Sequence, residues 1–134
     1  MGQPAAKQND KVVGVDIHIV MVPAPPAPPI PTPLPHPFNG KLDGGLSSNV
    51  KITGKPAAIL TSTATNSPSH TPTPPGTTFQ APPQNKSNII KGSATVLINN
   101  KPAARMGDTG LNCGTPPAPT GSIIATGAKV LIGG

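Results

Sequence analysis

The sequence predicts a small, single-domain, all-β protein with little helix. The 134 residues include 21 Pro and 15 Gly, so few stretches between prolines are long enough for a helix. Residues 11–22 alternate with a period of two and are rich in β-branched side chains, which is typical of a strand. Short β-prone runs recur along the chain with Gly, Ser or Thr between them, as in hairpins. We expect one domain covering residues 1–134.

The predicted core is thin. The chain has two Phe and neither Trp nor Tyr, so little apolar area is available for burial. A small domain of this composition usually needs a further source of stability. We therefore expect a bound metal, a partner surface, or both to help hold the fold.

The first predicted strand leads into a proline-rich stretch. Residues 11–22 place Val13, Val15, Ile17, Ile19 and Met21 on one face, and Val12, Asp16, His18, Val20 and Val22 on the other. Residues 23–40 follow, with a proline at almost every second position. We expect this stretch to be extended and polyproline-like, without internal hydrogen bonds.

Three related units recur along the chain. Residues 88–98 match residues 122–132, and each is expected to form a hairpin about its Gly/Ser/Thr turn. Residues 50–58 match residues 96–104, including a shared Lys-Pro-Ala-Ala. The units lie near residues 42–64, 88–108 and 122–134, and hairpins this short must pack together to bury a face. The repeat predicts an approximately threefold arrangement.

Charge and targeting signals exclude several classes of protein. The net charge of +6 comes from scattered lysines with no interleaved aromatic residues, so we expect no nucleic-acid partner. Cys113 is the only cysteine, so the chain forms no internal disulfide. The polar N-terminus shows no signal peptide, which predicts synthesis in the bacterial cytoplasm.

Three histidines and one cysteine are candidate metal ligands: His18, His36, His70 and Cys113. By residue type alone, the favoured interpretation is three surface histidines and a small buried cysteine. Each lies in or beside a proline-rich segment, however, and stiff extended loops can bring distant ligands to one point. Three imidazoles and a thiolate complete a tetrahedral zinc site, which predicts one structural zinc ion rather than a catalytic one.

The sequence resembles the PAAR family at residues 102–105, which read Pro-Ala-Ala-Arg. A β-prone run precedes this motif and Gly107-Asp108 follows it. Lys-Pro-Ala-Ala at residues 55–58 and Gln-Pro-Ala-Ala at residues 3–6 extend the likeness, although Ile59 stands where the motif has its arginine. The resemblance covers nearly the whole chain.

This resemblance implies a small β-rich cone built from hairpins in a pseudo-threefold arrangement, with long extended loops converging on a metal near the tip. It implies a non-enzymatic protein, monomeric on its own, that caps the blunt end of a trimeric VgrG-like spike. Such spikes belong to contractile injection systems, including type VI secretion systems and phage tails. The tip would sharpen the spike for membrane piercing, contact the target membrane transiently and help attach an effector or toxin. It would leave the cell with the apparatus.

The same resemblance suggests roles for residues of the base. The edges near six aliphatic residues are expected to continue the β-structure of the spike: Val50, Ile52, Val96, Ile98, Val130 and Ile132. Arg105 and Asp108 are either an ion pair that fixes the bend after the motif or two solvated charges.

Three alternatives remain open at this point. A zinc hydrolase would need an open metal position and a general base, and the chain has four Asp and no Glu. A zinc-stabilised proline-rich adaptor would use residues 23–37 but would leave the repeat unexplained. A PAAR-fused toxin would need a further domain, for which residues 1–134 offer no room, so any toxin is expected to be a separate partner.

Overall fold

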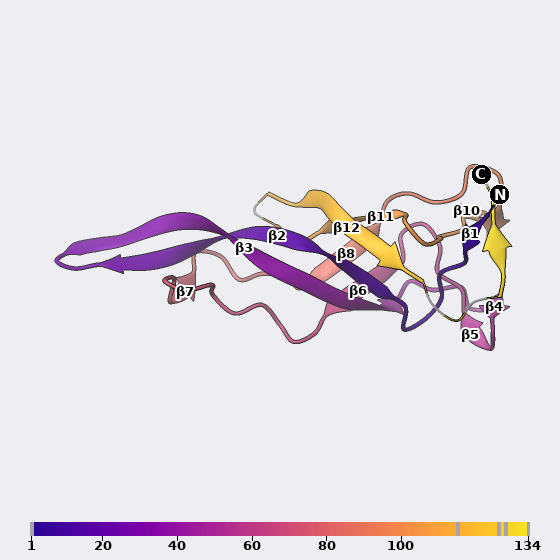
Figure 1. Ribbon diagram of the computed structural model, residues 1–134, viewed down its shortest axis with the longest axis horizontal. Coiled ribbons are helices and arrows are strands. Elements are labelled where there is room, and N and C mark those ends of the chain that lie inside the picture. Colours follow the sequence, from indigo (N-terminus) through magenta and orange to yellow (C-terminus); the bar gives the residue numbers. More distant parts are fainter. Residues whose placement is uncertain (1, 115, 126, 128, 134) are drawn as a thin grey trace.

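The computed structural model describes residues 2–114, 116–125, 127 and 129–133. The protein is elongated and tapers from a broad end, where both termini lie, to a long narrow hairpin (Figure 1). The described residues form strands and connecting segments without any helix, so none of them forms a helix that crosses a membrane. The strands are β1 (Gln3–Pro4), β2 (Lys11–Ala24), β3 (Ala27–Gly44), β4 (Lys51–Ile52), β5 (Lys55–Pro56), β6 (Thr63–Asn66), β7 (Thr78–Phe79), β8 (Lys86–Ile89), β9 (Leu97–Ile98), β10 (Lys101–Pro102), β11 (Thr109–Asn112), β12 (Ala118–Ile124) and β13 (Leu131–Ile132).

Six strands close into an antiparallel barrel in the middle of the molecule. Their order is β12-β11-β8-β6-β3-β2, and β12 also pairs with β2, which closes the ring. Strands β2, β6 and β11 leave the broad end, and β3, β8 and β12 return to it (Figure 1). The chain therefore makes three excursions toward the narrow end, and closure leaves no free sheet edge in the barrel.

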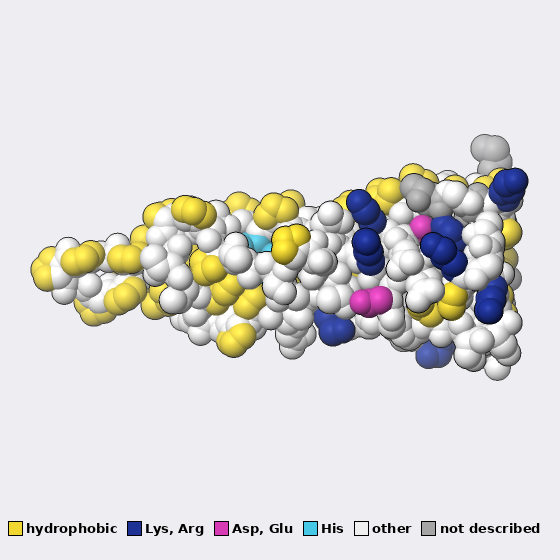
Figure 2. Space-filling model, turned by 90° about the horizontal axis from the view of Figure 1, so that it is seen from below, with side chains coloured by type: hydrophobic (Ala, Val, Ile, Leu, Met, Phe, Trp, Pro, Cys, Tyr) yellow, Lys and Arg dark blue, Asp and Glu magenta, His cyan; other side chains and the backbone are white. Residues whose placement is uncertain are grey.

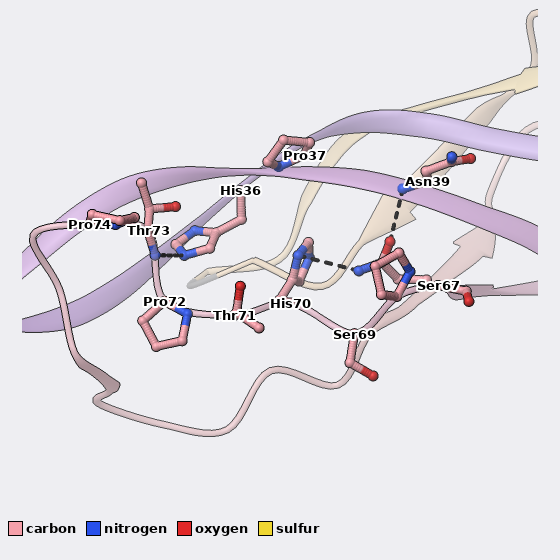
Figure 3. A pocket seen from close by; sticks show the side chains of 12 residues that line it. His36, Pro37, Asn39, Ser67, Ser69, His70, Thr71, Pro72, Thr73 and Pro74 are labelled. Carbon is pink, nitrogen blue, oxygen red and sulfur yellow. Dashed lines mark hydrogen bonds between the residues drawn. The ribbon is translucent and has the colours of Figure 1, made fainter.

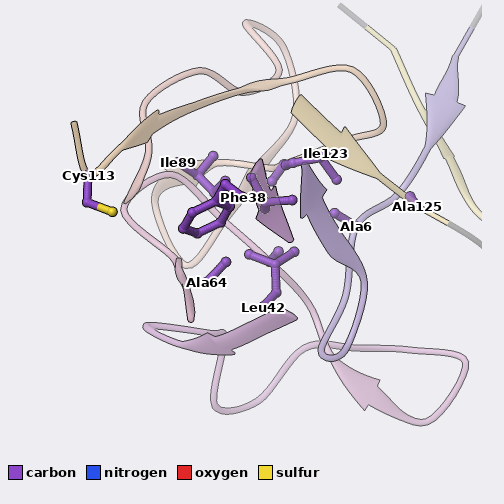
Figure 4. Close-up of a cluster of buried hydrophobic side chains, with 11 residues drawn as sticks. Ala6, Phe38, Leu42, Ala64, Ile89, Cys113, Ile123 and Ala125 are labelled. Atoms are coloured by element: carbon purple, nitrogen blue, oxygen red, sulfur yellow. The ribbon is translucent and has the colours of Figure 1, made fainter. Parts of the chain in front are cut away.

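The barrel encloses the main hydrophobic core. Phe38, Leu42, Ile89 and Ile123 are its largest buried apolar side chains, and Figure 4 shows them converging between the strands. Small residues fill the remaining space: a Cβ on Gly121 would collide with the buried Asn112 side chain. The core is confined to this narrow interior, which agrees with the small apolar content of the sequence.

Strand β2 has the predicted alternation. Val12, Asp16 and His18 are buried, whereas Val15 and Ile17 are 50% and 43% exposed. A polar pair therefore points inward and an aliphatic pair points outward, which reverses the usual pattern of a β-strand. This inversion is the first structural sign that the inward face has a role beyond packing.

The prediction of an unpaired polyproline-like segment over residues 23–40 is wrong in one respect. The segment is extended, but from Ala27 onward it is strand β3 and pairs with β2 along its length. Because its prolines fall on alternate residues, their missing N–H groups lie on one edge, and the residues between them remain free to bond β2. Spacing, rather than proline content, decides whether such a segment can join a sheet.

Three short antiparallel strand pairs form the broad end, called here the base. Two are true hairpins, β4 with β5 and β9 with β10; the third is an equivalent antiparallel pair of β13 with β1, which no turn connects, and the register is the same in all three. The prediction of hairpins within residues 88–98 and 122–132 is therefore wrong. Strand β8 pairs with β6 and β11 instead of β9, and β12 pairs with β11 and β2 instead of β13. The real turn of the second unit is Asn99-Asn100, whose φ angles of 52° and 67° suit a tight hairpin.

The two ends of the chain complete the third unit together. Gln3 pairs with Ile132 just as Lys101 pairs with Ile98 and Lys55 with Ile52. The Gln-Pro-Ala-Ala sequence at the N-terminus is thus the second half of a hairpin whose first half lies near the C-terminus.

A ring of backbone hydrogen bonds ties the three units around a common axis. Ala6 N–H donates to Ala104 C=O at 3.0 Å, Ala104 N–H to Ala58 C=O at 3.1 Å, and Ala58 N–H to Ala6 C=O at 3.0 Å. The three alanines are fully buried, which shows why the repeat needs a small side chain there. The predicted pseudo-threefold arrangement is confirmed by this closed ring.

The arginine of the motif forms an ion pair, which is one of the two alternatives that the sequence left open. Arg105 binds the Asp108 carboxylate at 3.1 and 3.2 Å, and the same carboxylate accepts the Arg105 backbone N–H at 2.8 Å. Its remaining guanidinium nitrogen donates to the Gly133 carbonyl at 3.1 Å. In the first unit, Ile59 takes the arginine position and Ser62 replaces the aspartate, with Ser62 Oγ accepting the Ile59 N–H at 2.9 Å. The same turn thus forms with a charged pair at Arg105 and Asp108 and without one at Ile59 and Ser62.

The outer face of the base mixes aliphatic and basic side chains. Ile52, Ile98 and Ile132 turn inward and are buried, whereas Leu97 and Leu131 are 60% and 63% exposed. The lysines and arginine visible in Figure 2 gather in the half of the molecule that contains the base. The other half, ending in the narrow hairpin, shows apolar and uncharged side chains.

Candidate metal centre

Each of the three excursions brings a candidate ligand to one point beyond the barrel core. His18 lies on β2 and His36 on β3, which together form the first excursion. His70 follows β6 in the second excursion, and Cys113 follows β11 in the third. A metal ion bound at this point would cross-link all three excursions.

The closest group consists of Asp16, His18, His70 and Cys113. One ligand atom from each residue lies within 4.8 Å of the other three. The Asp16 carboxylate lies 2.8 Å from His70 Nε2 and 3.3 Å from Cys113 Sγ, and Cys113 Sγ lies 3.7 Å from His18 Nε2. Soft sulfur, imidazole nitrogen and carboxylate oxygen are all zinc ligands, so the donor set suits that ion.

His36 lies beside this group without belonging to it. Its ring centroid is 5.4 Å from that of His18 and 5.6 Å from that of His70. Its Nδ1 lies 2.9 Å from the Leu34 carbonyl, and its Nε2 accepts the Thr73 N–H at 3.2 Å (Figure 3). Three of the four predicted ligands are therefore assembled with Asp16, and the fourth is adjacent and hydrogen-bonded elsewhere.

Asp16 was missed as a site residue because the sequence pattern weighs both faces of its strand equally. It is 2% exposed, and its Oδ1 finds no hydrogen-bond partner among the described residues. A buried carboxylate oxygen left without a partner is costly unless a cation or donor approaches it. The signal that could have identified it was its spacing, because residues two apart on a strand share a face and Asp16 thus lies beside His18.

Burial sets the protonation of the candidate ligands. Desolvation lowers the pKa values of His18 and His36, and the nearby His70 ring lowers both further. Desolvation, followed by the neighbouring Asp16 charge, raises the pKa of the Cys113 thiol. The lowered pKa values of His18 and His36 favour their neutral form, which is the form that binds metals, while the thiol needs a cation to lose its proton.

A shallow pocket of about 380 Å³ adjoins the site. It lies between the His36 side of β3 and the loop containing His70, and both rings contribute to its wall (Figure 3). Most of the other lining residues are Pro, Ser and Thr, and Lys, Arg, Asp and Glu are absent from the lining. The pocket offers no charged catalytic group beside the two histidines.

Comparison with known proteins gives one finding. A family model described as the PAAR motif matches residues 39–116, which is more than half of the chain. A search of curated proteins finds no match. The match spans the first two base units and includes Pro102-Ala103-Ala104-Arg105. With its pseudo-threefold base and the all-β architecture of the residues that the structure describes, the chain belongs to the PAAR family, the structural spike-tip proteins of contractile injection systems.

Proposed function

We propose that this protein caps the blunt end of a trimeric VgrG-like spike, with its base on the spike and its narrow hairpin leading. The observation that carries the proposal is the ring formed by Ala6, Ala58 and Ala104, which gives one chain a threefold base. A single chain of this kind can meet three identical subunits at once without a symmetry conflict. The protein would be made in the cytoplasm and carried out with the apparatus, with effectors as separate partners.

The base also presents suitable contact chemistry. Leu97 and Leu131 are the most exposed large apolar residues described, and they occupy equivalent positions in two units. Lys51 takes that position in the first unit. Each of three identical spike sites would therefore meet either a leucine or the aliphatic stem of a lysine, whose charge can remain at the rim.

Paired substitutions at opposite ends of the molecule test the capping role. Changing both Leu97 and Leu131 to Asp should abolish co-purification with the cognate spike, because two charges would enter an apolar contact. Ile30→Asp, at the narrow end, introduces the same charge at a residue that is 54% exposed and should leave co-purification unchanged. Spike binding that survives the base change would contradict the proposal.

We also propose one structural zinc ion at the narrow end, held by His18, His36, His70 and Cys113 as the sequence and the resemblance predict. The lowered pKa values of His18 and His36 and the gathering of the three excursions at one point support it. Use of His36 requires its ring to release the Thr73 N–H. Asp16, which already contacts a ring nitrogen of His70, would then hold that ring as a hydrogen-bond acceptor. When bound, the ion supplies a cross-link that resists splaying of the excursions under load.

Metal analysis of the purified protein tests this part separately. About one zinc per chain is expected, and Cys113→Ala should lower both the zinc content and the melting temperature. Absence of zinc from protein purified without chelators would contradict the site while leaving the capping role intact.

The proline-rich segment does not suit an adaptor for polyproline-binding domains. Such partners bind a free polyproline helix, whereas β3 pairs with β2 from Ala27 onward. The zinc hydrolase alternative gains no support either, because four protein ligands leave no open position for a reacting water.

A further inference from the structure

We propose that the tip hairpin, residues 20–32, partitions into lipid bilayers by itself, without the driving force of a contracting apparatus. The proposal rests on the spike-tip role only for its biological setting. Its physical basis is the uncharged surface of the hairpin and, above all, the small number of hydrogen-bond donors on its exposed backbone edge.

The side chains of the tip hairpin are compatible with lipid. Residues 17–39 contain no Lys, Arg, Asp or Glu. Ile30 is 54% exposed, and the neighbouring prolines are exposed as well. Figure 2 shows this end of the molecule covered by apolar and uncharged atoms, with the basic residues gathered at the other end. Partitioning would therefore bury apolar area without desolvating a charged side chain.

The outer edge of β3 lacks most of its hydrogen-bond donors. Successive residues of a strand point their N–H and C=O groups to opposite edges, so alternate residues share an edge. The Pro35 carbonyl accepts the Thr73 hydroxyl at 2.8 Å, which shows that Pro35 faces away from β2. Pro33, Pro31 and Pro29 follow at the same spacing and share that edge, and none of them has an N–H to donate.

The outer edge of β2 is covered near the tip by the segment around β7. The Ile19 carbonyl accepts the Gln80 N–H at 2.9 Å, and the Met21 carbonyl accepts the Thr77 N–H at 3.0 Å. Unsatisfied backbone groups are the main obstacle to placing sheet edges in hydrocarbon. One edge of this hairpin is thus paired and the other carries carbonyls without donors, which lowers the cost of entering lipid.

Protection against edge-to-edge pairing also explains prolines on a strand edge. Exposed edges are commonly protected by charged side chains too, especially lysine, and the chain has nine lysines. None lies between residues 17 and 39. The hairpin is therefore protected by prolines, which hydrocarbon tolerates, and lacks lysines, which hydrocarbon does not tolerate. This choice favours a lipid partner.

A single tryptophan reports on the hairpin cleanly because the chain has none of its own. Ile30→Trp should show blue-shifted fluorescence with zwitterionic phosphatidylcholine vesicles, and lipids brominated along their acyl chains should quench it. Zwitterionic lipid is chosen because the positively charged broad end of the protein would bind anionic vesicles for purely electrostatic reasons. The matched control is Leu131→Trp, because Leu131 lies on the base and is 63% exposed. Its fluorescence should be neither blue-shifted by the vesicles nor quenched by the brominated lipids.

The donor-free edge is tested by restoring two N–H groups. Pro31→Val with Pro33→Val, in the Ile30→Trp background, keeps apolar side chains and should weaken partitioning at least about tenfold.

An unshifted emission spectrum of the Ile30→Trp variant with both prolines intact, or an equal shift of the Leu131→Trp variant, would overturn the lipid proposal. Undiminished partitioning of the valine variant, or its self-association in solution with partitioning retained, would overturn the role of the proline edge. Spike co-purification of the Ile30→Trp variant, with and without the two valine substitutions, should be normal, so failure here is distinguishable from failure of the capping role.

Discussion

The Asp16 carboxylate lies 2.8 Å from Nε2 of His70, although the two residues come from different excursions of the chain. The same oxygen lies 3.3 Å from Cys113 Sγ, so one side chain contacts two candidate ligands. Asp16, on the first excursion, thus contacts one residue from each of the other two excursions. Carboxylates that position metal-binding histidines typically matter about 10–100-fold in metal affinity.

Asp16→Asn should therefore lower zinc affinity about 10–100-fold, as measured by competition with a chromophoric chelator. Asn keeps the size of the side chain and one acceptor oxygen but removes the negative charge. An affinity equal to that of the parent protein would show that Asp16 has no influence on the metal.

His36→Gln tests the fourth ligand in the same assay. As a lost ligand it should cost more zinc affinity than Asp16→Asn does. If the glutamine variant instead keeps one zinc per chain with near-parent affinity while Asp16→Asn loses it, the fourth ligand is Asp16 and the predicted set needs that exchange.

Arg105→Ile should destabilise the protein by about 2–3 kcal/mol in the free energy of unfolding, because it leaves the buried Asp108 carboxylate without its charged partner. Chemical denaturation measures the change. The double variant Arg105→Ile with Asp108→Ser reproduces the Ile59 and Ser62 pair of the first unit. It should recover most of the loss, and a double variant no more stable than the single one would refute the equivalence of the units.

Ala104→Val should cost about 1–3 kcal/mol in unfolding free energy, because two extra methyl groups must enter the fully buried ring around the threefold axis. Thermal denaturation provides the measurement. Ala94→Val, at an exposed site in the connection to β9, is the control and should change the melting temperature little. Equal effects of the two substitutions would mean that the ring is not tightly packed.

Stability in the presence of a chelator should fall as the pH drops below about 6.5, the ordinary pKa of histidine. Burial lowers the pKa values of His18 and His36 in the folded state, so the unfolded chain binds more protons over this range. Their contribution is fully present above pH 6.5 and is lost as the pH falls toward their folded pKa values. Unfolding followed by circular dichroism from about pH 8 to about pH 4 measures this dependence, and His36→Gln should flatten it. A stability that is constant across this range would contradict the assigned burial of the two rings.

Much of the fold could be predicted because short local sequence patterns define the repeat. The Lys-Pro-Ala-Ala segments and the β-branched residues before them specify a hairpin and a small-residue contact, and the structure contains both. The third unit could not be found by a search for direct repeats, because its halves lie at opposite ends of the chain. Only Gln3 and Pro4 beside Ile132 and Leu131 reveal it.

The strand character of residues 27–44 and the role of Asp16 could not be predicted for a different reason. Proline content suggested unpaired backbone, and only the pairing register with β2 shows that the missing donors face outward. For Asp16, the spacing places it on the same face as His18, but the sequence cannot say whether that face of β2 is buried. Both questions are decided by neighbours distant in sequence.

The mass of the complex with the cognate spike tests the central claim most directly. Native mass spectrometry of the reconstituted assembly should give one copy of this chain for every three spike subunits, since the closed ring through Ala6, Ala58 and Ala104 arranges three base units of one chain around a common axis. Three copies per spike trimer, or no complex at concentrations well above those in the cell, would contradict the account.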